Sequence, residues 1–173
     1  MKQFALFMVL LFMSSVSFES YAQAISKAKA DDDTENFVYE IEGVDIGAQG
    51  TYLVKVWSYS KRPSVATEQA KKNAVHGIIF KGFVGRTGVP GQRPLTTNAN
   101  IEQEKKEFFD NFFADGGKYM KFVTVSGDGS VAAEDRMKVG KRYKIGVIVS
   151  VNVSELRKDL EAAGIIRSLN SGF

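Results

Sequence analysis

The segment "RYKIGVIVSVNV", which begins at Arg142, shows the clearest alternation of apolar and other residues along the chain. Its apolar residues occupy every second position: Ile145, Val147, Val149, Val151 and Val153. Successive side chains of a β-strand point to opposite faces, so this pattern predicts a strand with one buried face.

A second extended segment, Thr51 to Ser60, carries large side chains at both sets of alternating positions. One side of such a strand would carry Tyr52, Val54 and Val56, and the other would carry Leu53, Lys55, Trp57 and Tyr59. We therefore expect a strand that is partly covered on both faces. The turn residues "GAQG" separate it from an extended segment that begins at Phe37, which predicts a β-hairpin.

Small residues at helical spacing predict a helix that begins at Pro63. Its apolar face consists of Ala66, Ala70, Ala74, Val75 and Ile78. The alanines imply that this helix lies close to the surface that it covers. We expect the helix to end between Phe80 and Phe83, because Gly82 and Gly85 are natural stops.

Capping residues predict two further helices. The helix "IEQEKKEFFDNFFAD" would start after Asn98 or Asn100 and end at a pair of glycines. Its aromatic stripe, made of Phe108, Phe109, Phe112 and Phe113, favours packing into the core, and an exposed ridge that docks a partner is the alternative. The last helix, "SELRKDLEAAG", would be capped by Asn152 or Ser154.

Two remaining segments are candidates for strands: "YMKFVTVSG" and, more weakly, residues 131–139. Strands therefore cluster along the chain instead of alternating with helices. This order predicts an α+β fold, with a mainly antiparallel sheet and two to three helices packed on one face.

The first 22 residues have the pattern of a secretory signal peptide. Lys2 precedes an apolar run from Phe4 to Met13, and small residues follow, so we expect cleavage after Ala22 or Ala24. The run is much shorter than the roughly 20 residues of a spanning helix, and we expect no integral membrane span in the mature chain. Residues 23–36 are expected to be a flexible leader, and residues 37–173 a single α+β domain.

The composition argues against several kinds of chemistry. The chain has no cysteine and one histidine, His76, so disulfides, thiolate nucleophiles and metal sites that need several such ligands cannot form. The consecutive Asp31, Asp32 and Asp33 lack the spacing of a calcium loop, and we expect no metal and no cofactor. The net charge of +3 is too small to indicate a nucleic-acid-binding stripe. No motif near His76 supplies a nucleophile or acid, so we expect this histidine to be structural.

The glycine- and proline-rich segment "GFVGRTGVPGQRP" is the first candidate site. It does not match a phosphate-binding loop, because no lysine follows its glycines and its prolines lack the backbone N–H. Long connections in compact domains are often functional. We therefore expect Val84 to Leu95 to contact a protein partner through Arg86, Val89 and Arg93, with a plain surface loop as the alternative.

Lys55, Trp57 and Tyr59 form the second candidate site. These residues would lie on one face of the predicted strand, where the aromatic rings could stack against a sugar or another small ligand. Ordinary packing against neighbouring strands is the alternative.

Two stretches carry a resemblance to a known family. These are "GTYLVKVWSYSKRPSVATEQAKKNAV" and "GKRYKIGVIVSVNVSELRKDLEAAGI", each a strand that leads into a helix. Together they resemble the N-terminal domain of flagellar assembly protein T and related small outer-membrane lipoproteins. The resemblance implies an α+β fold in which a sheet cradles a helix, and a non-enzymatic role in envelope assembly. This chain lacks the cysteine that a lipoprotein anchor requires, and the matching stretches contain no functional residue.

These observations lead to one expected function and two alternatives. We expect an exported, non-catalytic protein of the periplasm or outer membrane of a Gram-negative bacterium, which binds an envelope protein partner. A glycan- or small-ligand-binding module that uses the Trp57 face is the alternative. A hydrolase is the least supported class, because no nucleophile–base pair is visible. We expect no nucleic-acid partner, and the sequence leaves open whether the chain forms a homo-oligomer.

Overall fold

The computed structural model describes residues 37–127 and 129–168 of the chain. Residues Phe37–Phe173 form one compact unit. The expected signal peptide, residues 1–22, and the expected leader, residues 23–36, lie outside the described residues. None of the described helices is long and apolar enough to cross a membrane.

The unit is built on a five-stranded antiparallel sheet. Its strands are β1 (Tyr39–Ile46), β2 (Thr51–Ser60), β3 (Val123–Val125), β4 (Arg136–Val139) and β5 (Arg142–Asn152). The order across the sheet is β1-β2-β5-β3, and β4 also pairs with β5. β3 and β4 therefore pair with different segments of the same edge of β5. β3 pairs near the C-terminal end of β5, and β4 pairs near its N-terminal end.

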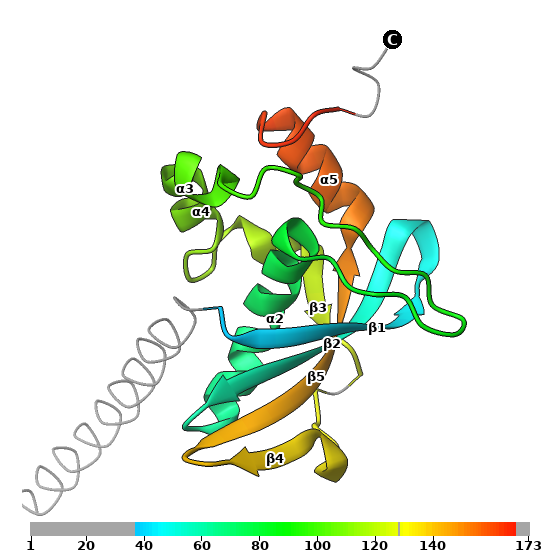
Figure 1. Cartoon of the computed structure of the whole chain (residues 1–173), viewed down its shortest axis with the longest axis vertical. Coiled ribbons are helices and arrows are strands. Elements are labelled where there is room, and N and C mark those ends of the chain that lie inside the picture. The colour runs from blue at the N-terminus through cyan, green and yellow to red at the C-terminus, as the bar shows by residue number, and fades with distance from the viewer. Residues whose placement is uncertain (1–36, 128, 169–173) are drawn as a thin grey trace, which may run out of the picture. The chain divides into compact units, whose positions relative to one another are not determined.

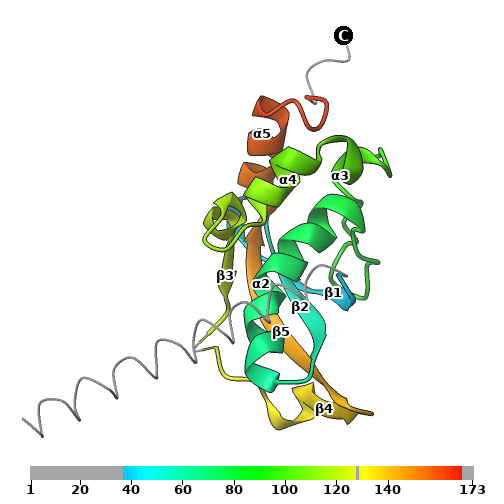
Figure 2. The ribbon, with the colours of Figure 1, turned by 90° about the vertical axis from the view of Figure 1, so that its left-hand side faces the viewer.

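The helices gather on one side of this sheet. They are α2 (Pro63–Phe80), α3 (Ile101–Glu104), α4 (Lys106–Phe112) and α5 (Val153–Ala162), with short 3-10 turns at Ala48–Gly50, Lys118–Phe122 and Ala133–Asp135. In Figures 1 and 2, α3, α4 and α5 gather at one end of the unit and β4 lies at the other. Figure 2 shows α2 running along the sheet between these ends. The predicted α+β class, with an antiparallel sheet, is confirmed.

The alternation in the two longest strands decides which face is buried. In β5 the predicted apolar set is buried, and in β2 the buried set is Val54, Val56, Ser58 and Ser60. Both sets face α2, whose alanines at positions 66, 70 and 74 are fully buried. Small side chains allow the helix to approach the sheet closely, as the spacing of the alanines predicts. The same core includes Leu156 and Leu160 of α5.

Two sequence-based expectations differ from the structure. The predicted second helix is broken at Lys105, whose backbone (φ −116°, ψ 35°) is not helical, so α3 and α4 are separate. The segment "YMKFVTVSG" is a strand only from Val123, because Lys118–Phe122 forms a 3-10 turn. Tyr119 and Phe122 are both buried. A 3-10 turn places residues three apart on the same side, whereas a strand would send them to opposite faces.

The predicted aromatic stripe packs into the core. Phe109, Phe112 and Phe113 are buried, and Phe108 is half-buried against them. The rings of Phe109 and Phe80 meet edge to face, with centroids 5.0 Å apart, so the stripe joins α4 to the end of α2. An exposed aromatic ridge is therefore not present on α4.

Candidate functional site

The second face of the sheet carries Lys55, Trp57 and Tyr59, as the alternation of β2 predicts. These three side chains are partly exposed, while their neighbours Val54, Val56 and Ser58 are buried beneath α2. α2 covers the opposite face, and the 3-10 turn Ala133–Asp135 reaches this second face through the contact between Asp135 and Lys55. We call it the open face, and its members are Glu40, Glu42, Lys55, Trp57, Tyr59, Asp135 and Lys144.

The indole ring of Trp57 lies directly over the backbone of Gly146, its cross-strand partner in β5. A Cβ atom at Gly146 would come within 2.9 to 3.1 Å of three ring carbons, so the absence of a side chain there lets the ring lie close to the strand. The indole Nε1 donates a hydrogen bond to Glu42 Oε1 at 3.0 Å. The ammonium groups of Lys55 and Lys144 lie 5.3 and 5.1 Å from the ring centroid, within cation–π distance. The ring is therefore held from beneath and from two sides.

Ion pairs link the remaining members of the open face. Lys55 Nζ donates to both carboxylate oxygens of Asp135, at 2.8 and 2.9 Å. Lys144 Nζ likewise donates to both oxygens of Glu40, at 2.9 and 2.8 Å. The Tyr59 hydroxyl donates to Glu40 Oε1 at 2.6 Å. The face therefore presents aromatic rings among paired charged side chains.

The electrostatics of Glu40 and Lys144 favour the charged form of both groups. The hydrogen bond from Lys144, followed by that from Tyr59, holds the pKa of Glu40 below its usual value. Burial is the largest single influence and lowers the pKa of Lys144, but the hydrogen bonds and charge interactions with Glu40 and Tyr59 together outweigh it and raise the pKa of the lysine. Both groups stay ionised at neutral pH, so the network persists under ordinary conditions.

The glycine- and proline-rich segment is a folded hairpin instead of an open loop. Backbone hydrogen bonds pair Phe83 with Gln92, and Arg86 with Val89. The side chain of Val89 is 7% exposed and packs beside Gly43 and Phe83. Val89 is therefore a packing residue, which corrects its expected role as a partner contact. Nearby, Val84 is 89% exposed, although the sequence reasoning did not single it out.

The structure brings the two predicted sites together. Arg86 Nη1 lies 3.7 Å from Glu42 Oε2, and the other oxygen of this carboxylate accepts the hydrogen bond from Trp57. The hairpin therefore reaches the open face at the β1 edge, where Figure 1 shows it passing beside the end of β1. Arg93 is exposed and makes no hydrogen bond or ion pair with the described residues of this network, so it is not joined to the site. The connection through Glu42 joins the strand residues to the hairpin in one surface.

Sequence reasoning missed the acidic members of the open face and Lys144. Their positions depend on strand register: Glu40 lies opposite Trp57, Glu42 opposite Lys55, and Lys144 opposite Tyr59. The hairpin turn before Thr51 was a signal that could have placed the two glutamates. Asp135 precedes β4 and reaches Lys55 from a segment 80 residues away, and no local pattern indicates this contact.

His76 is buried in an aromatic cluster away from the open face. The Tyr39 hydroxyl donates to Nδ1 at 2.6 Å, and Nε2 lies 3.3 Å from Glu102 Oε1. A carboxylate accepts hydrogen bonds, so Nε2 carries a proton, and in the neutral ring Nδ1 then accepts from the Tyr39 hydroxyl. The ring of Phe37 stacks on the imidazole at 3.6 Å. Burial lowers the pKa of His76, and burial and then the charge of Glu102 raise the pKa of Tyr39, which keeps its proton.

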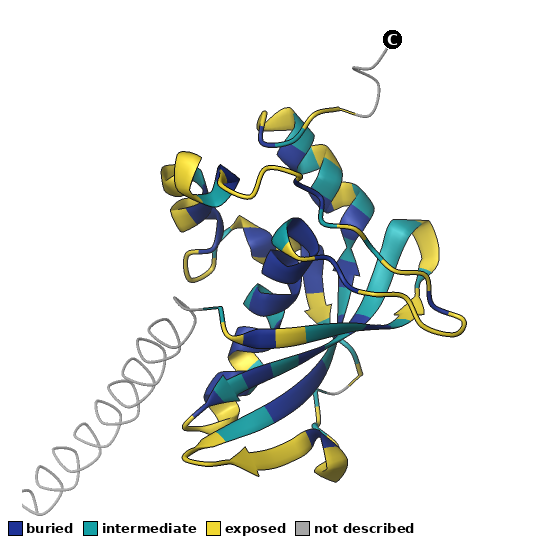
Figure 3. Cartoon of the chain, viewed as in Figure 1, coloured by how far each residue is buried: buried dark blue, intermediate teal, exposed yellow. Residues whose placement is uncertain are grey.

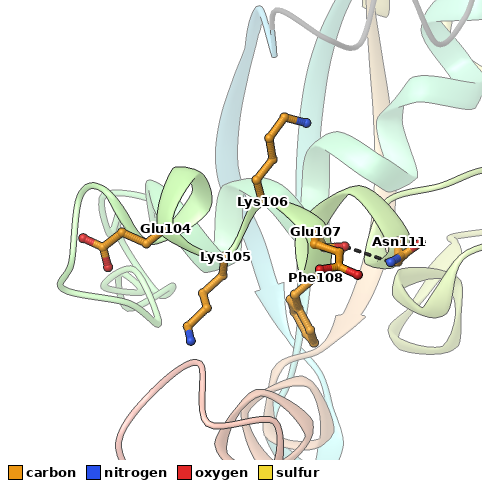
Figure 4. Close-up of a pocket in the computed structure, with 6 residues that line it drawn as sticks. All are labelled: Glu104, Lys105, Lys106, Glu107, Phe108 and Asn111. Carbon is orange, nitrogen blue, oxygen red and sulfur yellow. Dashed lines mark hydrogen bonds between the residues drawn. The ribbon is translucent and has the colours of Figure 1, made fainter.

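A hollow of 360 Å³ lies beside the junction of α3 and α4 (Figure 4). It is lined by Glu104, Lys105, Lys106, Glu107, Phe108 and Asn111. All of these except Phe108 are exposed, and Asn111 Nδ2 donates to the Glu107 carbonyl at 2.9 Å. Ligand sites usually combine apolar walls with a few converging polar groups. This hollow has mainly charged side chains that point outward, so the open face is the stronger candidate.

No group of three or more His, Asp or Glu side chains that could hold a metal ion occurs in the part of the chain that the structure describes. A comparison with protein-family models, with curated proteins and with solved structures gives no match to this chain.

Proposed function

We propose that this chain is an exported, non-catalytic protein of the cell envelope that binds a protein partner through the open face of its sheet. The observation that carries the proposal is the network that runs from Arg86 through Glu42 to Trp57. It makes the hairpin and the strand face one continuous surface.

The composition of this surface supports a protein partner. Trp, Tyr and Arg are the residues that most often dominate the binding energy of protein interfaces, and the surface contains one or more of each. The hydrogen bonds to Glu40 and Glu42 hold Tyr59 and Trp57 in place before a partner arrives. Preordered side chains lose less conformational entropy on binding. The alternating positive and negative side chains would also favour a partner whose surface carries the complementary arrangement of charges.

Export and the envelope location rest on the signal-like residues 1–22 and on the resemblance to the flagellar and lipoprotein family. A non-catalytic role is supported by the place of His76. This only histidine of the chain lies among Phe37, Phe80 and Phe113, with both ring nitrogens occupied by Tyr39 and Glu102.

Site-specific photo-crosslinking in the source bacterium tests the proposal. A benzophenone amino acid would replace Tyr59 in one strain and Arg86 in another, and Asn111 on exposed α4 in a control strain. We expect the same discrete protein adduct from Tyr59 and Arg86, and no such adduct from Asn111. The absence of an adduct at both test positions, or the same adducts at Asn111, would contradict the proposal.

A glycan is the second candidate for the open face, because the ring of Trp57 remains partly exposed between the two lysines. Trp57 is the only tryptophan in the chain, so its fluorescence reports directly on this face. A saturable change of fluorescence with soluble cell-wall fragments would favour the glycan. An unchanged spectrum, together with a protein adduct at Tyr59, would favour the protein partner.

A further inference from the structure

The end of the sheet that carries β4 concentrates positive charge. Its six cations are Lys61, Arg62, Arg136, Lys138, Lys141 and Arg142, and all six are exposed. Strand pairing brings them together from separate segments: Ser60 lies opposite Tyr143 in β5, and Val139 of β4 lies opposite Arg142. We call this set, with Met137 and Val139, the basic corner.

The cations of the basic corner have no acidic partners among the residues that the structure describes. Two acids of the open face are already in ion pairs with other lysines. Asp135 pairs with Lys55, and Glu40 pairs with Lys144. The remaining ion pairs of the described residues use other cations. Arg142 makes a cation–π contact with Tyr59, at 5.8 Å from its ring centroid, which leaves its charge in place. Within the described residues no ion pair therefore neutralises the six cations of the corner, although the whole chain carries only +3.

Two apolar side chains lie within this charged set. Met137 is 41% exposed and Val139 is 51% exposed, and both belong to β4. All four residues of β4 are exposed, as Figure 3 shows. Gly140, with φ +60°, makes the tight turn that leads from Val139 back into β5. Met137 and Val139 project from one face of β4, on the side of Arg142, and Arg136 and Lys138 project from the other face, so the corner is a short hairpin with cations on both faces and apolar side chains on one.

We propose that the basic corner docks this protein on the surface of an anionic lipid bilayer. Lysine and arginine side chains near such a surface are attracted by its negative potential, and apolar side chains between them enter the boundary of the acyl chains. A soluble polyanion would use the six cations but would gain nothing from Met137 and Val139. In Figures 1 and 2 the corner lies at the opposite end of the unit from α3, α4 and α5, so docking leaves those helices facing away from the lipid. The inference does not depend on the proposed partner of the open face.

Vesicle co-sedimentation of the mature chain, without residues 1–22, tests this inference. The core of the fold lies among residues that follow this cut, so the truncation leaves the core complete. The probes are vesicles that contain phosphatidylglycerol, with vesicles of phosphatidylcholine alone for comparison. We expect binding to the anionic vesicles only, and release at high salt because mobile ions screen the attraction.

Three variants distinguish an effect of the basic corner from an effect of the net charge of the chain. Lys138→Gln, Lys141→Gln and Arg142→Gln together are expected to weaken partitioning about a hundredfold, at roughly fivefold for each charge. The matched control, Lys105→Gln, Lys121→Gln and Arg167→Gln, removes the same charge from exposed positions outside the corner and should change partitioning only slightly. Met137→Ser with Val139→Ser should weaken it about tenfold. All substituted side chains are exposed, and thermal unfolding confirms that each variant is folded.

Two results would overturn the inference. Equal losses in the corner and control variants would show that the effect is one of net charge. Binding to dextran sulfate as tight as to vesicles, with no effect of the Met137 and Val139 substitutions on either, would show that the corner takes a polyanion and not a bilayer. The salt dependence of vesicle binding by the unmodified chain is the reference for both results, because measuring it requires no substitution.

Discussion

At the scale of single residues, His76 joins three separate parts of the chain. It lies on α2, accepts a hydrogen bond from Tyr39 of β1, and donates to Glu102 of α3. Lys81 is the other charged group near this cluster, with its ammonium 3.8 Å from the centroid of the Tyr39 ring. Protonation of Nδ1 would remove the acceptor that Tyr39 uses. The cluster is therefore built for a neutral imidazole.

We predict that acid destabilises the fold through His76. Burial lowers the pKa of this group below its usual 6.5 in the folded state, whereas the unfolded chain keeps the usual value. The unfolded state then binds a proton first, so the stability contributed by neutral His76 is complete above about pH 6.5 and declines as the pH falls toward the lowered folded-state pKa. Urea unfolding at a series of pH values measures this slope.

The control for this prediction is His76→Asn. This variant is expected to be less stable at every pH, because the cluster is disrupted, but to lack the slope just below pH 6.5. An equal slope in His76→Asn would assign the pH dependence to other groups and contradict the prediction.

At the scale of elements, the junction of β5 and α5 depends on Asn152. Its side-chain Oδ1 accepts a hydrogen bond from the backbone N–H of Glu155 at 3.0 Å, which is the bond of a helix N-cap. The sequence left Asn152 and Ser154 as alternative caps, and the structure selects Asn152. The same residue is the last of β5, paired with Thr51, so one position ends the strand and begins the helix.

We predict that Asn152→Ala lowers the free energy of unfolding by about 1 kcal/mol, because a backbone N–H at the start of α5 loses its acceptor. Asn152→Asp keeps an acceptor oxygen and adds a negative charge at the helix N-terminus, so it should remain close to the unmodified chain. Chemical denaturation of the two variants measures the difference. Equal losses in both would indicate that the amide matters for the strand pairing and not for the cap.

At the scale of the whole unit, a single core joins the described helices and every strand except β4, whose residues are all exposed. It extends from Tyr39 in β1 to Ile165 after α5, and includes side chains from each long helix and strand. The two surface features lie on different parts of the same sheet: the open face across β1, β2 and β5, and the basic corner where β4 meets β5. One rigid sheet can therefore present both surfaces at once.

We predict that residues 37–173 unfold in one cooperative transition. A contiguous core gives no boundary at which half of the unit could melt separately. Calorimetry should give equal calorimetric and van't Hoff enthalpies, with the same midpoint as the chain that begins at residue 23. Two transitions, or a midpoint that falls when residues 23–36 are removed, would show that the unit is not self-sufficient.

Much of the fold could be predicted because its longest elements carry their own periodicity. The bounds of α2, β2 and β5 follow from alanine spacing, from glycine stops and from strict alternation. The break at Lys105 and the turn at Lys118–Phe122 could not be predicted, since both arise where short segments bend to bury aromatic rings. Local spacing is ambiguous over so few residues, and tertiary packing decides.

The sequence by itself determined the fold class, the main elements and the face of β2 on which Lys55, Trp57 and Tyr59 lie. These properties depend on side-chain periodicity within single segments. Only the tertiary structure decided that Val89 is buried, that Arg86 reaches Trp57 through Glu42, and that six cations from separate segments meet beside β4. Each of these depends on strand register or on contacts between distant segments, which no local pattern of residues specifies.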